Sequence, residues 1–139
     1  MKLPSWKKDL RAYLYSCRDK GFCWGSWDCL KFVNGAVKVQ CGVGFADDWF
    51  GSYSTARGAA LNYAKITRYG IYNNIIEGLD DRLKRSDNKA KTGSIVAIKS
   101  DSDVLGYSLG VKVEDTVALV GDNSLLFINL NNFMTWSVE

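Results

Sequence analysis

Two segments in the first third of the chain carry apolar residues at the three- and four-residue spacing of an amphipathic helix. Residues 5–19 predict the first helix, with Ser5 at its N-cap, Gly21 after its end and an apolar face of Trp6, Leu10, Tyr13, Leu14 and Cys17. The second begins near Cys29 and is stopped by Gly42 and Gly44. Its apolar face consists of Cys29, Phe32, Val33, Ala36, Val37 and Gln40.

The pattern then changes twice along the chain. A third helix is expected from about Thr55, with a face of small side chains, and a short fourth one over Ile71–Leu83. The polar stretch RLKRSDNKAKTG that follows predicts a loop. From Gly93 apolar and polar residues alternate, which predicts about five short strands in SIVAIK, YSLGVKV, TVALV, SLLFINL and MTWSV.

A helical half followed by a strand half is typical of the α+β class, with the helices on one side of an antiparallel sheet. The 139 residues fit one domain, 1–139, whose helical half is 1–90 and whose strand half is 91–139. The longest apolar runs, such as Ser124–Leu130, are far below the roughly 20 residues of a membrane span. The start of the chain does not resemble a secretory signal, so we expect synthesis and residence in the cytoplasm.

The formal net charge of +3 is concentrated at the N-terminus, where residues 1–20 hold six Lys or Arg and two Asp. We interpret these side chains as a solvated helix face and expect no nucleic-acid partner, because no binding module accompanies them. The four cysteines, Cys17, Cys23, Cys29 and Cys41, leave disulfides, a metal site or reduced thiols open. Reduced thiols are favoured in a cytosolic chain, and no metal or other cofactor is expected, since the chain has no C-x-x-C pair and no histidine.

The segment GFCWGSWDCLKF, residues 21–32, holds the chemistry of greatest interest. Asp28 is expected to cap the second helix, which places Cys29 in its first turn. Unpaired amides and the helix dipole there favour a thiolate and can stabilise an oxyanion. A nucleophile and an ordinary core cysteine are both compatible with this position.

The same residues resemble a known family. The elements WGSWDC and WFGSYST, in that order, followed by the terminal TWSV, are similar to a small phage-encoded branch of the NlpC-type papain-like cysteine peptidases. The resemblance covers nearly the whole chain and implies a papain-like fold. It places the family nucleophile at Cys29, preceded by the acidic Asp28.

The other catalytic positions of the family do not match. The histidine that acts as general base falls on Ser108, the polar residue that orients it falls near Val120, and a frequent tyrosine falls on Phe22. Loss of the base costs triad-type hydrolases about 10⁴- to 10⁶-fold in rate. Asp47 or Asp48 would be a poor substitute, because a carboxylate near pKa 4 matches a thiol near 8.5 badly.

Aromatic residues supply the candidate binding surface. The loop FADDWFGSYS is interpreted either as a groove beside Cys29 or, preferably, as a structural corner. Five tryptophans are too many for the core of so small a domain, so some are expected at an interface. The candidates are Trp24, Trp27, Trp49, Tyr53 and Trp136, with Trp136 the first choice for an exposed one.

The resemblance and the lost base together favour a non-catalytic phage virion or assembly protein, a tail or head–tail connector component that binds other phage structural proteins. We expect it in the host cytoplasm during synthesis and then in the particle. The sequence leaves the oligomeric state open, and a ring or another multi-copy assembly is compatible with this role. The alternative is a cysteine hydrolase of the peptidoglycan peptidase or amidase type, with Cys29 as nucleophile and an unconventional or partner-supplied base.

Overall fold

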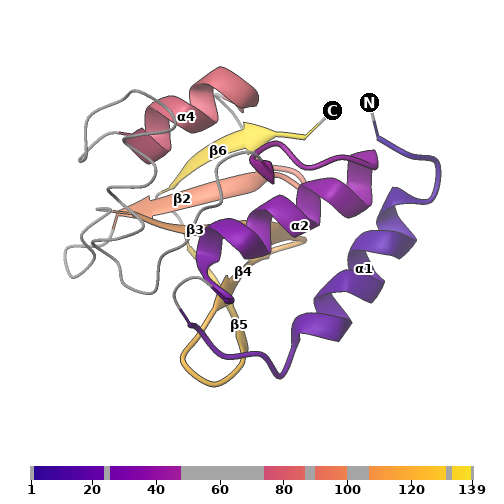
Figure 1. Ribbon diagram of the computed structural model, residues 1–139, viewed down its shortest axis with the longest axis vertical. Helices are drawn as coiled ribbons and strands as arrows, with labels where there is room; N and C mark the ends of the chain where they lie inside the picture. Colours follow the sequence, from indigo (N-terminus) through magenta and orange to yellow (C-terminus); the bar gives the residue numbers. More distant parts are fainter. Residues whose placement is uncertain are drawn as a thin grey trace.

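The computed structural model describes residues 2–23, 26–47, 74–86, 90–99, 107–130 and 133–138. Three helices and six strands lie within these ranges (Figure 1). In chain order they are α1 (Trp6–Cys17), α2 (Cys29–Cys41), α4 (Asn74–Arg82), β1 (Lys84–Ser86), β2 (Ile95–Lys99), β3 (Tyr107–Val113), β4 (Thr116–Val120), β5 (Leu125–Ile128) and β6 (Met134–Ser137).

All six strands form one antiparallel sheet in the order β1-β6-β2-β3-β4-β5. Strands β2 to β5 follow one another as a meander, but the last strand, β6, lies between β1 and β2. It pairs Trp136 with Ile95 on one side and with Arg85 on the other. The sheet therefore ends in β1 at one edge and in β5 at the other.

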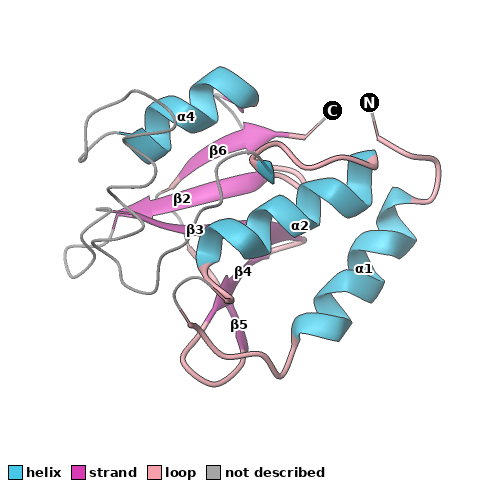
Figure 2. Ribbon diagram, in the orientation of Figure 1, coloured by secondary structure: helices cyan, strands magenta, loops and turns pink. Residues whose placement is uncertain are grey.

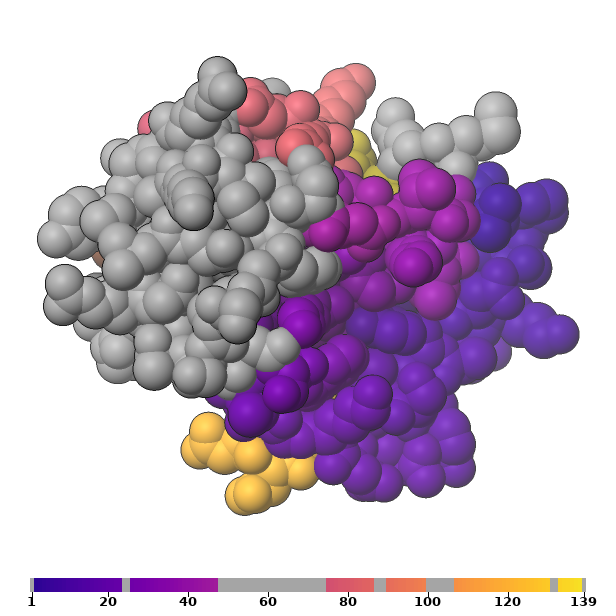
Figure 3. Space-filling model, viewed as in Figure 1, coloured from indigo at the N-terminus to yellow at the C-terminus, as the bar shows by residue number. Residues whose placement is uncertain are grey.

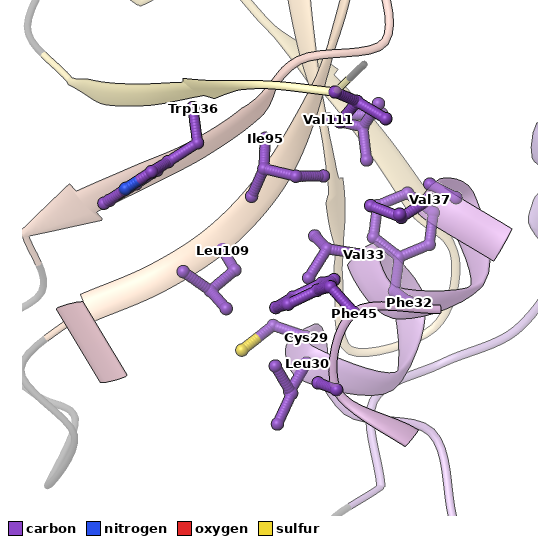
Figure 4. Packing of buried hydrophobic residues seen from close by; sticks show 14 of the residues in the cluster. Cys29, Leu30, Phe32, Val33, Val37, Phe45, Ile95, Leu109, Val111 and Trp136 are labelled. Atoms are coloured by element: carbon purple, nitrogen blue, oxygen red, sulfur yellow. The ribbon is translucent and has the colours of Figure 1, made fainter. Parts of the chain in front are cut away.

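The helices cover one face of this sheet (Figure 2). Ile95, Val111 and Trp136 share that face because they are cross-strand partners or lie an even number of residues apart. Helix α2 packs on it through Phe32, Val33 and other side chains, and Figure 4 shows these residues interdigitating with the sheet. The predicted α+β class, with helices on one side of the sheet, is confirmed.

Helix α2 has the boundaries that its sequence predicts. Its apolar face is buried at every predicted position, from Cys29 to Gln40. Gly42 ends the helix in the left-handed region, with φ of 87°, where a glycine has no steric penalty.

Helix α1 leans on α2 rather than on the sheet. The Tyr13 hydroxyl donates to the Phe32 carbonyl over 2.8 Å, and the two rings stack with centroids 6.0 Å apart. The predicted cap is wrong in detail: Ser5 occupies the N-cap position, but its hydroxyl donates to the Asp9 carboxylate and caps no backbone amide.

One strand was not expected. Lys84–Ser86 lies in the stretch that the sequence predicts as loop, yet it pairs with β6 as β1. Arg85 anchors it by donating twice to the Asp80 carboxylate of α4, over 2.9 Å each time, and these bonds lower the pKa of Asp80. A polar edge strand that forms by pairing with a distant segment has no apolar alternation in its own sequence from which it could be predicted.

The helix expected from Thr55 lies outside the described residues.

Candidate functional site

The thiol of Cys29 sits at the start of α2, after a short aromatic turn. Cys23 and Trp27 form an antiparallel bridge that reverses the chain just before the helix. The carboxylate of Asp28 then accepts a hydrogen bond from the Lys31 amide over 3.0 Å and caps the helix, as the sequence predicts. Cys29 therefore occupies the first helical turn, where backbone amides point out of the helix end.

The same thiol is largely enclosed, since Cys29 is only 8% exposed. Figure 4 shows its side chain directed toward the sheet, near Leu30 and Leu109. Leu109 shares the helix-covered face of β3 with Tyr107, Val111 and Val113, and it is 1% exposed. The β3 side chain that Figure 4 shows near this thiol is therefore a leucine, not the histidine of the family.

Ser108, the position of the missing histidine, belongs to the other face of the sheet. It pairs with Ile98 across β2, and successive side chains of a strand point to opposite faces. Since Leu109 packs in the core beneath α2, Ser108 points away from that helix. The structure does not bring Ser108 and Cys29 together on one side of the sheet.

The other family positions are also occupied by groups that cannot assist a thiol. Val120 is partly buried in β4 and packs against the core. Phe22 donates its backbone amide to the Gly121 carbonyl over 2.8 Å, which ties the loop before Cys29 to the end of β4.

Asp47, the carboxylate considered as a substitute base, is committed elsewhere. It accepts a hydrogen bond from the Asn34 amide over 2.6 Å, and Asn34 in turn accepts the Ala46 amide over 2.8 Å. Asn34 lies five residues after Cys29 in α2, which is about 140° around the helix and about 7.5 Å along its axis. Asp47 is thus anchored to a different part of α2, and Asp48 lies outside the described residues.

The aromatic residues expected at a binding surface differ in burial, and some of them lie outside the described residues. Trp27 is half-buried, meets Phe32 edge to face at 6.0 Å and carries the Lys20 ammonium 4.5 Å above its ring. Trp136, expected at an interface, is fully buried, so that expectation is wrong: its indole closes β6 against α4 and donates to Asp80 over 2.8 Å. Trp24, Trp49 and Tyr53 lie outside the described residues.

The described ranges contain no disulfide, metal cluster or membrane-spanning helix. None of the four cysteines forms a disulfide. Within those ranges no group of three His, Cys, Asp or Glu side chains is arranged to hold a metal ion. Nor does that part of the chain contain a helix with the length and apolar character needed to cross a membrane.

A hollow of about 360 Å³ lies between α1 and the β3–β4 turn. Leu10 and Leu14 contribute its apolar wall, while Lys7, Arg11 and Glu114 bring charges of both signs. Two basic residues of the N-terminal segment, Lys7 and Arg11, thus line part of a shallow recess. Both side chains are exposed, in agreement with the solvated helix face that the sequence predicts.

The sequence analysis missed one surface altogether. Leu126, Phe127 and Ile128 of β5 are 48%, 50% and 36% exposed, although all three are large and apolar. A signal was available, because they form the centre of the uncharged run Ser124–Leu130. Its length excludes a membrane span but not an exposed apolar strand.

Fold and site together define an α+β domain with a capped, enclosed cysteine and no histidine in the chain to act as its base. The chain belongs to a family described as a domain of unknown function, DUF6950, whose model matches residues 1–138. No curated protein and no solved structure matches it.

Proposed function

We propose that the protein is a non-catalytic phage virion or assembly protein that uses an NlpC-like, papain-type scaffold to bind other structural proteins. The sequence resemblance around Cys29 supports the proposal that the scaffold derives from an NlpC-type peptidase. One observation carries the loss of catalysis: the chain has no histidine, and Ser108, at the position of the family's histidine, lies on the face of the sheet away from Cys29. A hydrolase of this class that has lost its histidine base loses most of its rate.

Burial supports the same proposal. An acyl substrate must reach within bonding distance of the sulfur, and a residue that is 8% exposed offers it little surface. Cys29 packs instead as a small apolar side chain between α2 and the sheet, which is a common role for a cysteine in a core.

One observation favours the second candidate, a peptidoglycan-type cysteine hydrolase. Asp28 still caps α2 and Cys29 still lies in its first turn, where amides favour a thiolate and can bind an oxyanion. In that case another protein would have to supply the base.

Site-resolved thiol labelling separates the two candidates. Iodoacetamide at neutral pH, followed by peptide mass spectrometry, reports the rate at each cysteine. For a non-catalytic scaffold we expect the exposed Cys23 to react fastest and Cys29 no faster than the half-buried Cys41. A hydrolase predicts the reverse order, because an activated thiolate reacts quickly despite limited access.

Cell-wall digestion and phage assembly give the complementary test. Cleavage of peptidoglycan fragments that is lost in Cys29→Ala and kept in Cys23→Ala would establish the hydrolase. We expect no cleavage by any of the three proteins. We also expect the chain at fixed stoichiometry in purified particles and full infectivity of the Cys29→Ala phage; absence from the particles would refute the structural role.

A further inference from the structure

The two edges of the sheet differ in how they are protected. Edge strands usually carry charges or are very short, which prevents them from pairing with another chain. β1 follows this rule, because it has three residues and two of them are Lys84 and Arg85. β5 does not, because Leu125–Ile128 contains no charged residue and three of its four side chains are exposed.

The hydrogen-bond pattern shows which backbone groups of β5 face outward. Gly121 donates to the Ser124 carbonyl at the end of the β4–β5 ladder, over 2.9 Å. Because hydrogen-bonded pairs alternate in an antiparallel ladder, Leu126 and Ile128 bond to β4, whereas Leu125 and Phe127 point away from it.

The outward edge is closed at its start and open at its centre. Leu125 donates its amide to the Arg18 carbonyl over 3.0 Å, so the chain after α1 covers the beginning of the strand. In the described ranges no backbone group meets the amide or carbonyl of Phe127. Figure 3 shows the atoms around residue 120, in orange, projecting at the lower edge of the molecule.

We propose that this edge is an interface between two copies of the chain, formed by antiparallel pairing of β5 with β5 of a second copy. Phe127 would lie opposite Phe127 of the second copy, so that each amide donates to the other carbonyl. Leu126 would then lie opposite Ile128 on the other face, which gives apolar cross-strand pairs on both faces of a continuous sheet.

Charge and symmetry select this pairing among those that two edges allow. Pairing β1 with β1 would bring Lys84 and Arg85 of the two copies together. Pairing β1 with β5 is head to tail and would continue into an open chain of subunits. Pairing β5 with β5 brings no charges together and closes after two copies.

The proposed interface is small, so we expect the two copies to associate weakly. A four-residue strand from each copy buries less than the about 1,200 Å² at the lower end of stable complexes. We therefore expect a dissociation constant weaker than about 1 μM. The pairing rests on the geometry of the sheet edge alone and holds whether or not Cys29 is catalytic.

Sedimentation velocity of the full chain, from about 10 μM to about 1 mM, tests the association. We expect the weight-average mass to rise from 15.5 kDa toward twice that value. Hydrogen exchange gives the location: the Phe127 amide should become protected as concentration rises, whereas the Leu126 amide should be protected throughout.

Three edge variants and one control complete the test. Phe127→Pro removes the outward donor without removing a bond to β4, and Leu126→Lys and Ile128→Lys give β5 the charge that β1 carries. Each should weaken the dimer at least about tenfold. Val43→Lys, at an apolar position that is 68% exposed and outside the sheet, should leave it unchanged. If Phe127→Pro does not unfold cooperatively, it is not folded well enough for the test, and the two lysine variants then show whether β5 forms the interface. A chain that stays monomeric throughout, or a dimer that the edge variants leave intact, would overturn the proposal.

Discussion

Tyr13 illustrates how one side chain couples the two N-terminal helices. Its hydroxyl donates to the Phe32 carbonyl, and its ring stacks on Phe32. Burial raises the pKa of this phenol far above its ordinary value of about 10, and the neighbouring Cys17 thiol raises it further. The neutral form is therefore the one that the folded chain holds.

This shift predicts a loss of stability at alkaline pH. Below about pH 10 the phenol is protonated in the folded and unfolded states, so its contribution is fully present. Above that pH only the unfolded chain ionises, and the contribution falls by about 1.4 kcal/mol per pH unit. Urea unfolding should show wild type more stable than Tyr13→Phe by about 1 kcal/mol at pH 8, and the difference should fall to zero and reverse in sign by about pH 11.

Tyr15 supplies the matched control. It is 66% exposed, so Tyr15→Phe should change the stability at pH 8 by less than Tyr13→Phe does. A difference between wild type and Tyr13→Phe that stays constant over this range would contradict the assignment.

The contact between α1 and α2 depends on a glycine in the middle of a helix. Gly35 lies in α2, where glycine is about 1 kcal/mol less favourable than alanine. A Cβ at this position would lie 2.7 Å from Cζ and 3.0 Å from Cε1 of Tyr13, and closer still to its hydroxyl. The glycine is what allows the Tyr13 ring to lie against α2.

Gly35→Ala should consequently destabilise the protein although it improves helix propensity. Overpacking costs about 1–3 kcal/mol, which exceeds the gain of about 1 kcal/mol. In a Tyr13→Leu background the clash is relieved, so the same substitution should stabilise. Urea unfolding of the four proteins in this double-mutant cycle should give a coupling energy of at least about 1 kcal/mol. Additive effects would show that the helices do not meet at this pair.

At the scale of the whole molecule, the last strand holds the sheet together. β6 lies between β1 and β2 and contributes Trp136, which is fully buried; Val138, directly after the strand, is 3% exposed. Its removal would separate β1 from the rest of the sheet and expose the core beneath α4.

A chain that ends at Leu130 should for this reason lose cooperative unfolding in urea and its near-ultraviolet circular dichroism. A chain that ends at Ser137 keeps β6 and loses the Val138 side chain, so it should unfold cooperatively with a stability lower by about 1–3 kcal/mol. A cooperative transition of the shorter chain at the wild-type midpoint would contradict the role given to β6.

Local sequence alone determined the α+β class, the limits of α2 at Asp28 and Gly42, and five of the six strands. Helix caps and residue periodicity act over a few positions, so the chain encodes them where they occur. The missing histidine was equally evident, since composition needs no fold. Tertiary structure decided that β1 exists, that Trp136 is buried and that Ser108 lies on the face of the sheet away from Cys29. It also decided that β5, with Phe127 at its centre, is left open at an edge. These features depend on strand order and on which face of the sheet the helices cover, and both arise from contacts between residues far apart in the chain.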